Sequence, residues 1–122
     1  MVANKVGLVL IQGSESLLAD RAISQILATK TQSQVITLFA SEVELGVITD
    51  NLAPSLFGDQ RVVVIKEIQD LDSDCSDEIS SYLENQDENL TLVLWHKGGV
   101  KGKALDDKLK KAGAQIIAAE AI

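Results

Sequence analysis

The chain has 122 residues, the length of one ordinary domain, and 46% of them are hydrophobic against 24% charged. With one proline, this composition excludes a disordered or collagen-like protein. The formal net charge of −7 and only four aromatic side chains disfavour a platform that stacks nucleic-acid bases.

Cysteine use and hydropathy restrict the cellular setting. Cys75 is the single cysteine, which excludes an internal disulfide and any zinc site built from two or more cysteines. The first apolar run, 6–11, lacks the flanks of a signal peptide, and no run approaches the length of about 18 apolar residues that a membrane span needs. We therefore expect a cytoplasmic protein with no membrane partner.

Short apolar runs alternate with segments of helical periodicity along the whole chain. In chain order they predict a strand over 6–11, a helix around 19–27 with Ser14 as N-cap, a strand over 35–39, a helix over 41–52 ended by Pro54, a strand over 61–65, a helix capped by Asp74, a strand over 90–95, a helix over 104–111 and a strand over 115–118. Strands that alternate with helices favour right-handed crossovers. We therefore expect a three-layer α/β domain with a five-stranded, mostly parallel sheet. Because the chain stops directly after the last strand, we expect one domain of a longer protein.

In such a sheet, ligands bind beyond the carboxyl ends of the strands, so a nucleotide site would lie there. After the first strand, Gly13 could open a phosphate-binding turn, but the glycine, lysine and hydroxyl that should follow are replaced by Leu18, Ala19 and Asp20. After the third strand, Lys66 stands where a magnesium-binding acid belongs. The shape of a nucleotide site is predicted without its chemical groups. No cofactor and no catalytic residue is therefore assigned.

Metal binding is also disfavoured. Four acids near the third helix resemble the opening of a calcium loop: Asp70, Asp72, Asp74 and Asp77. Cys75 and Ser81 stand where that loop needs glycine and glutamate, so these acids are interpreted as a helix entry. His96 has no second histidine to share a metal or a triad, and the acidic surroundings of Cys75 disfavour a thiolate.

The charge is uneven along the chain. Residues 1–96 hold 15 acids and 5 bases, a balance of −10, whereas residues 97–122 hold 3 acids and 6 bases, a balance of +3. Six lysines between Lys97 and Lys111 could contact a phosphate backbone. Asp106 and Asp107 interrupt them, which favours a solvated loop and helix face.

Two large apolar residues, Leu56 and Phe57, stand side by side in the turn-forming segment 54–61. Adjacent residues on a loop cannot easily face one buried surface. They either cover the core beneath the loop or are exposed to a partner. A loop that leads into a parallel strand lies at the amino edge of the sheet, opposite the edge of a phosphate site.

The order of several motifs resembles the first domain of the delta subunit of bacterial DNA polymerase III. The central motif is Leu-Phe-Gly, a charged pair and a valine-rich strand, and it is accompanied by segments 8–15, 81–85, 92–95 and 109–114. The resemblance implies an AAA+ fold with a degenerate nucleotide site, and a longer protein whose lid and collar domains are missing here.

The resemblance also implies a function. The family's delta subunit is the arm of the clamp loader that opens the ring-shaped sliding clamp during DNA replication. Its hydrophobic wedge carries over to Leu56 and Phe57, with Ser55 at the preceding position of the clamp-binding motif. By the same resemblance, sister subunits supply the ATP energy and bind through the missing domains, and this non-enzymatic domain serves a DNA-directed DNA polymerase. A contact with DNA is possible only in the full complex.

Two other hypotheses remain open from the residues. One is an NTP-binding enzyme whose atypical phosphate loop is built on Gly13. The other is a DNA-contacting domain that uses the lysines from Lys97 to Lys111. The first predicts stabilisation by ATP with magnesium, and the second predicts DNA binding that weakens steeply with salt.

Overall fold

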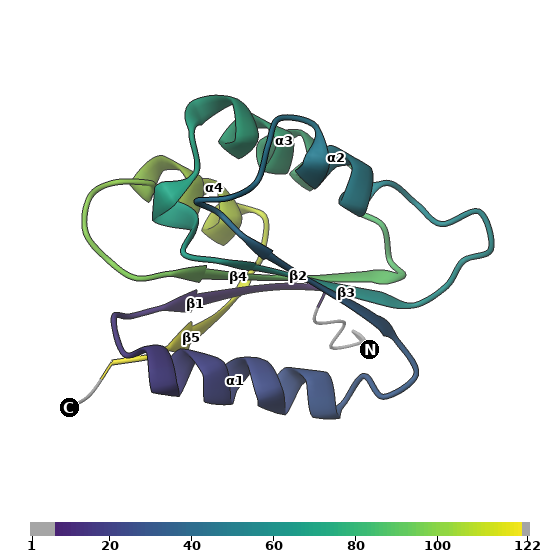
Figure 1. Cartoon of the computed structure of the whole chain (residues 1–122), viewed down its shortest axis with the longest axis horizontal. Helices are drawn as coiled ribbons and strands as arrows, with labels where there is room; N and C mark the ends of the chain where they lie inside the picture. The colour runs from purple at the N-terminus through teal and green to yellow at the C-terminus, as the bar shows by residue number, and fades with distance from the viewer. Residues whose placement is uncertain (1–6, 121–122) are drawn as a thin grey trace.

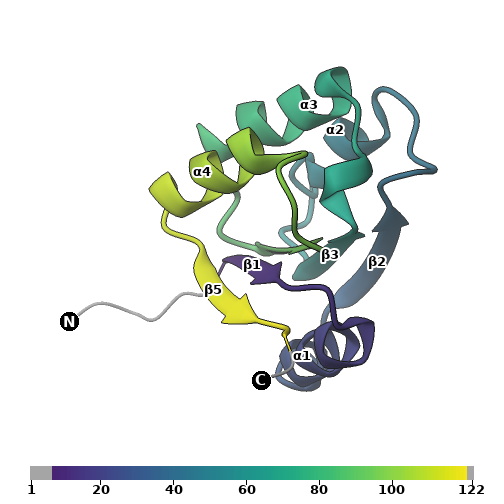
Figure 2. The same cartoon turned by 90° about the vertical axis from the view of Figure 1, so that its left-hand side faces the viewer.

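The computed structural model describes residues 7–120, which form a five-stranded sheet between two helical layers. Figures 1 and 2 show α1 alone beneath the sheet and the other three helices above it. The strands are β1 (Leu8–Gln12), β2 (Gln34–Phe39), β3 (Arg61–Lys66), β4 (Leu90–His96) and β5 (Gln115–Ala118). The helices are α1 (Ser16–Ala28), α2 (Val47–Leu52), α3 (Ser73–Leu83) and α4 (Lys103–Lys111), with a 3-10 turn at Ile68–Asp70.

Every pairing of strands in this sheet is parallel, in the order β2-β3-β4-β1-β5. The predicted three-layer α/β fold is therefore confirmed. Strands β3 and β4 lie in the middle and are buried almost throughout, whereas the edge strands β2 and β5 are partly exposed. Within the described part of the chain, no helix is long and apolar enough to span a membrane.

The two faces of the sheet carry separate cores because successive strand residues point to opposite faces. Alternate valines of β3 show this: Val63 packs with α2, α3 and α4, whereas Val62 and Val64 pack with α1. Helix α1 contributes Ala19, Ala22 and Ile23 to the core, and the two small alanine side chains let it lie close to the strands.

The structure corrects two predicted helix starts. Helix α1 has Glu15, not Ser14, as its N-cap, because the Glu15 amide is held by the carbonyl of Ala119. Helix α3 is capped by Asp72 rather than Asp74, because the Asp72 carboxylate accepts the Cys75 amide at 2.8 Å.

The predicted helix over 41–52 is wrong in its first half, since α2 begins only at Val47. Gly46 adopts a left-handed conformation with φ +94°, which interrupts the helix. The Glu78 carboxylate of α3 then accepts the Gly46 amide at 2.9 Å and the Thr49 amide at 2.7 Å. A side chain 32 positions away therefore fixes where α2 begins. The first strand starts at Leu8, and the predicted position Val6 lies outside the described residues.

Candidate functional site

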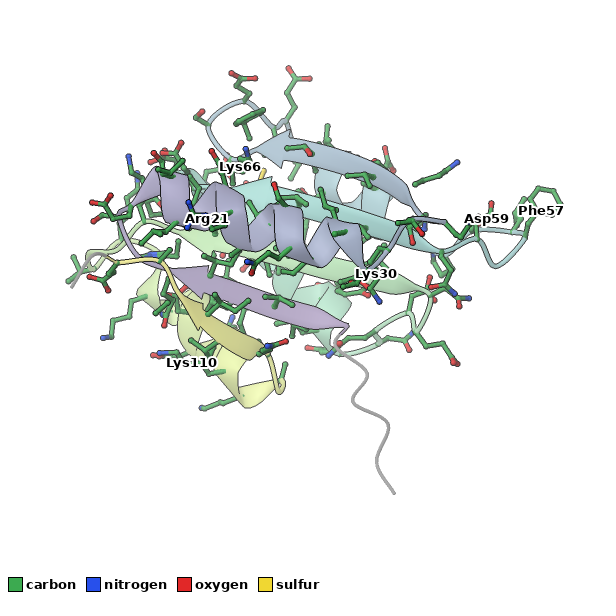
Figure 3. All side chains as sticks on the ribbon, turned by 90° about the horizontal axis from the view of Figure 1, so that it is seen from below. Arg21, Lys30, Phe57, Asp59, Lys66 and Lys110 are labelled. Atoms are coloured by element: carbon green, nitrogen blue, oxygen red, sulfur yellow. The ribbon has the colours of Figure 1, made fainter. Side chains whose placement is uncertain are left out.

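The segment between α2 and β3 is a loop at the amino edge of the sheet that projects from the body of the domain. Figure 3 shows Phe57 and Asp59 near its tip, far from Arg21, Lys66 and Lys110. Leu56 is 95% exposed and Phe57 87% exposed, so neither covers the core. Of the two interpretations left open by the sequence, the structure supports exposure.

The loop is ordered by its own polar groups. The Ser55 hydroxyl oxygen accepts the Phe57 amide at 3.2 Å and lies 3.3 Å from the Asp59 carboxylate, to which it donates. The Gly58 amide donates to the Ser55 carbonyl at 3.3 Å, and Gly58 takes a left-handed φ of +67°. Ser55 thus holds the turn that displays Leu56 and Phe57.

Arg61 fixes the base of this loop. Its guanidinium donates to the Asn51 carbonyl at 2.9 Å and pairs with the Asp87 carboxylate at 3.2 Å, although Arg61 is only 8% exposed. The Asn89 side chain accepts the Gln60 amide group at 2.9 Å, and the Asn89 carbonyl accepts the Arg61 backbone amide at 3.0 Å. The end of α2, the start of β3 and the α3–β4 connection are therefore tied together beneath the loop. Sequence analysis missed these residues, because only folding brings them within reach of one another.

The opposite edge holds the turn after β1, where a phosphate would bind. The Gly13 amide donates to the His96 carbonyl at 3.0 Å, and the Glu15 amide donates to the Ala119 carbonyl at 3.0 Å. A Cβ at Gly13 would lie 2.3 Å from the Ala119 oxygen, so glycine here serves close packing with the chain after β5. Two N–H groups that could cradle a phosphate are thus occupied by the protein itself.

The neighbouring ion pair has the wrong charges for a magnesium site. The Lys66 ammonium lies 3.3 Å from the Asp20 carboxylate and 5.5 Å from the centroid of the Phe39 ring. A phosphate-binding loop would place a hydroxyl at Asp20 and an acid near Lys66 to hold the metal. Here the two side chains neutralise each other.

His96 holds a glycine-rich loop rather than a reacting group. Its Nε2 lies 2.6 Å from the Lys101 carbonyl, which can only accept, and its Nδ1 accepts the Gly98 amide at 3.0 Å. These contacts assign the neutral Nε2–H tautomer. The Asp106 carboxylate lies 3.6 Å from Nδ1 and accepts the Gln12 side-chain amide at 3.3 Å. Among residues 7–120, no group of three or more histidine, cysteine or acidic side chains could hold a metal.

Cys75 is buried at the start of α3, beneath the acids that resembled a calcium loop. Burial, followed by the hydrogen bond with Asp72 and nearby negative charges, raises the pKa of its thiol to about 11. The expectation that its surroundings disfavour a thiolate is thereby supported.

The lysines of the 97–111 segment are divided between a loop and α4. Lys97 lies 3.8 Å from the Glu67 carboxylate, and the Lys108 ammonium donates to the Ser80 hydroxyl at 3.3 Å. Asp106 is buried, whereas Asp107 is exposed on the same helix. This surface is of mixed charge, as the interrupted pattern predicted.

The sequence profile of the family described as DNA polymerase III, delta subunit, matches residues 9–120. The chain belongs to this family. Among curated proteins, none matches the chain significantly.

Solved structures show the same fold. The Bacillus subtilis DNA clamp loader delta protein YqeN superimposes with a TM-score of 0.72 at 18% identity, covering 95% of this chain and 39% of its own. The Thermotoga maritima RuvB Holliday junction branch migration motor superimposes with a TM-score of 0.63 at 23% identity, covering 94% of this chain and 37% of its own. A DNA polymerase III gamma subunit-related protein of Thermotoga maritima superimposes with a TM-score of 0.63 at 16% identity, covering 98% of this chain and 43% of its own.

This delta-family chain therefore has an AAA+-type fold and spans about two fifths of the length of the solved proteins it resembles. The predicted family and fold are confirmed. The wedge residues Ser55, Leu56 and Phe57 remain predictions, which the exposed loop makes testable.

Proposed function

We propose that this domain binds and opens a ring-shaped sliding clamp, with Leu56 and Phe57 entering an apolar pocket on the clamp surface. The observation that carries the proposal is the exposure of two adjacent large apolar side chains, Leu56 at 95% and Phe57 at 87%, on one ordered loop. Exposed apolar groups on a stable loop are typical of a protein interface.

The loop geometry favours tight binding. Burial of each wedge side chain contributes roughly 1.5–3 kcal/mol, and two such residues can form the hot spot of an interface. Because Ser55 and Gly58 already hold the turn, less conformational entropy is lost on binding than a free loop would lose. Ser55 acts here as a positioning residue.

The proposal assigns ATP hydrolysis to sister subunits of the loader. It is supported by the turn at Gly13, whose amide already has a partner, and by the Lys66–Asp20 pair. In the full-length protein, further lid and collar domains join the other loader subunits of the polymerase holoenzyme. A contact with DNA is possible only in that cytoplasmic complex, and the domain itself is not an enzyme.

The test is a titration of the domain against the sliding clamp of its own species. We expect saturable binding by the wild type. For Leu56→Ala/Phe57→Ala we expect the binding free energy to weaken by about 3 kcal/mol, which raises the Kd more than a hundredfold. The matched control is Leu45→Ala/Val100→Ala, which removes two side chains that are 70% and 88% exposed elsewhere. Equal affinities of the two double variants would refute the wedge, provided that both retain the wild-type melting temperature.

The alternative, an NTP-binding enzyme, is tested by thermal unfolding with ATP and magnesium. A ligand at 100 times its Kd stabilises the folded state by about 2.7 kcal/mol. We expect no shift, because the amides at Gly13 and Glu15 already donate to carbonyls. A shift that Gly13 or Asp20 substitutions abolish would favour the enzyme instead.

A further inference from the structure

A groove lies between the C-terminal ends of α2 and α3, at the foot of the wedge loop. Its volume is about 270 Å³. Since liquid water occupies about 30 Å³ per molecule, this is room for about nine waters or one long side chain. Pro54 lines the groove and directly precedes Ser55, so the groove and the wedge loop form one continuous surface.

The wall of the groove is mostly apolar. It is built from Leu52, Ala53 and Pro54 at the end of α2 and from the ring of Tyr82 on α3. The Tyr82 hydroxyl accepts the Asp87 amide at 3.1 Å, which fixes the ring in place. Such a wall suits an aliphatic stem, and the fixed aromatic ring also suits a cation.

The rim of the groove is acidic. Glu78 accepts three hydrogen bonds, from the Gly46 amide and from both the amide and the hydroxyl of Thr49. Burial raises the pKa of Glu78, but these hydrogen bonds outweigh it and hold the pKa below its ordinary value, so the carboxylate is charged at neutral pH. Within residues 7–120, no lysine or arginine forms an ion pair with Glu78. Its negative charge faces the groove without a cationic partner.

We propose that this groove binds a lysine or arginine side chain of the same clamp whose apolar pocket takes Leu56 and Phe57. The inference rests on the proposed function, and it adds the chemistry of a second contact. The aliphatic stem of such a side chain packs on Leu52, Pro54 and Tyr82, and its charged end meets Glu78. A purely apolar side chain would leave the carboxylate without a cationic partner, and an acidic one would be repelled.

The test compares clamp affinities of variants that fill or recharge the groove. Ser81→Arg places a cationic side chain of the domain's own into the groove from an exposed position on α3, and Ser24→Arg adds the same charge on α1, across the sheet. We expect Ser81→Arg to bind about tenfold more weakly than Ser24→Arg. Asn85→Asp adds a rim carboxylate, and Gln25→Glu adds the same charge on α1. We expect Asn85→Asp to bind about two- to threefold more tightly than Gln25→Glu at low salt, with the difference vanishing at high salt.

Each outcome decides one statement. Equal affinities of Ser81→Arg and Ser24→Arg, with wild-type binding intact, would overturn the groove and leave the wedge standing. Weaker binding of Ser81→Arg together with unchanged or weaker binding of Asn85→Asp would overturn the cationic occupant. A wild type that binds no clamp would overturn the proposed function itself, before any groove variant is compared. All four variants must keep the melting temperature of the wild type, which excludes unfolding as the cause of an affinity change.

Discussion

Arg61 is a buried charged residue whose removal is expected to destabilise the domain strongly. Its guanidinium holds the Asn51 carbonyl and the Asp87 carboxylate, whose side chain is 14% exposed. Removing one partner of a buried ion pair typically costs about 3–5 kcal/mol, because the other charge is left unpaired. Asp87 keeps some contact with water, and Nε of Arg61 has no partner to lose. We therefore expect Arg61→Ala to lower the free energy of unfolding by about 3 kcal/mol, which is a fall of about 12 °C in Tm for a chain of this length.

The assay is urea unfolding of Arg61→Ala, Asp87→Ala and the double variant. Because both side chains belong to one pair, we expect the double variant to lose clearly less than the sum of the single losses, with a coupling of about 1–3 kcal/mol. Arg21→Ala on the exposed face of α1 is the control, with a change within about 0.5 kcal/mol. Additive losses, or a loss of less than about 1 kcal/mol for Arg61→Ala, would refute the reasoning that this pair ties the loop base together.

Three further predictions follow from other contacts. Gly13→Ala places a Cβ 2.3 Å from the Ala119 oxygen at a φ of +144°, so calorimetry should show that the free energy of unfolding falls by at least about 2 kcal/mol. The control is Gly7→Ala, whose Cβ would lie 3.6 Å from the nearest atom and should change the stability little. Cys75, with a thiol pKa of about 11, should react with a thiol reagent at pH 8 only after unfolding, and labelling of the native protein at the rate of a free thiol would contradict its burial. The folded-state pKa of Glu78 lies below its ordinary 4.5, so its contribution to stability is present above that value and is lost as the pH falls through the folded pKa. Between about pH 6 and pH 3, the free energy of unfolding should therefore decrease less for Glu78→Gln than for the wild type. Equal decreases would contradict the lowered pKa of Glu78.

The strands could be predicted from the sequence because local patterns decide them. Apart from Arg61 and Thr91, the runs 61–65 and 90–95 are apolar, as is typical of strands buried on both faces, and β3 and β4 extend each run by only one residue. The helix starts were less predictable, since they depend on distant groups. Glu78 caps α2 from another helix, and no local pattern around Gly46 contains that information.

The candidate loop was predictable in position but not in conformation. Adjacent Leu56 and Phe57 in a turn-forming segment indicated an exposed pair or a cover for the core, and only the folded chain decides between them. The groove was not predictable, because it forms only where the C-terminal ends of α2 and α3 come together in the folded chain.

The two edges of the sheet show why this fold can present a partner site without nucleotide chemistry. At the carboxyl edge, the Gly13 and Glu15 amides donate to carbonyls and Lys66 pairs with Asp20, so little binding capacity is left over. At the amino edge, Leu56 and Phe57 are exposed, and the hydrogen-bonded Glu78 carboxylate forms no ion pair with a lysine or arginine of the described residues. Binding free energy comes from apolar groups and charges that a partner can cover or neutralise and that are held in position beforehand. A clamp that docks at the amino edge therefore needs no rearrangement of the nucleotide edge, and wild-type and Gly13→Ala domains that are both folded should bind it equally.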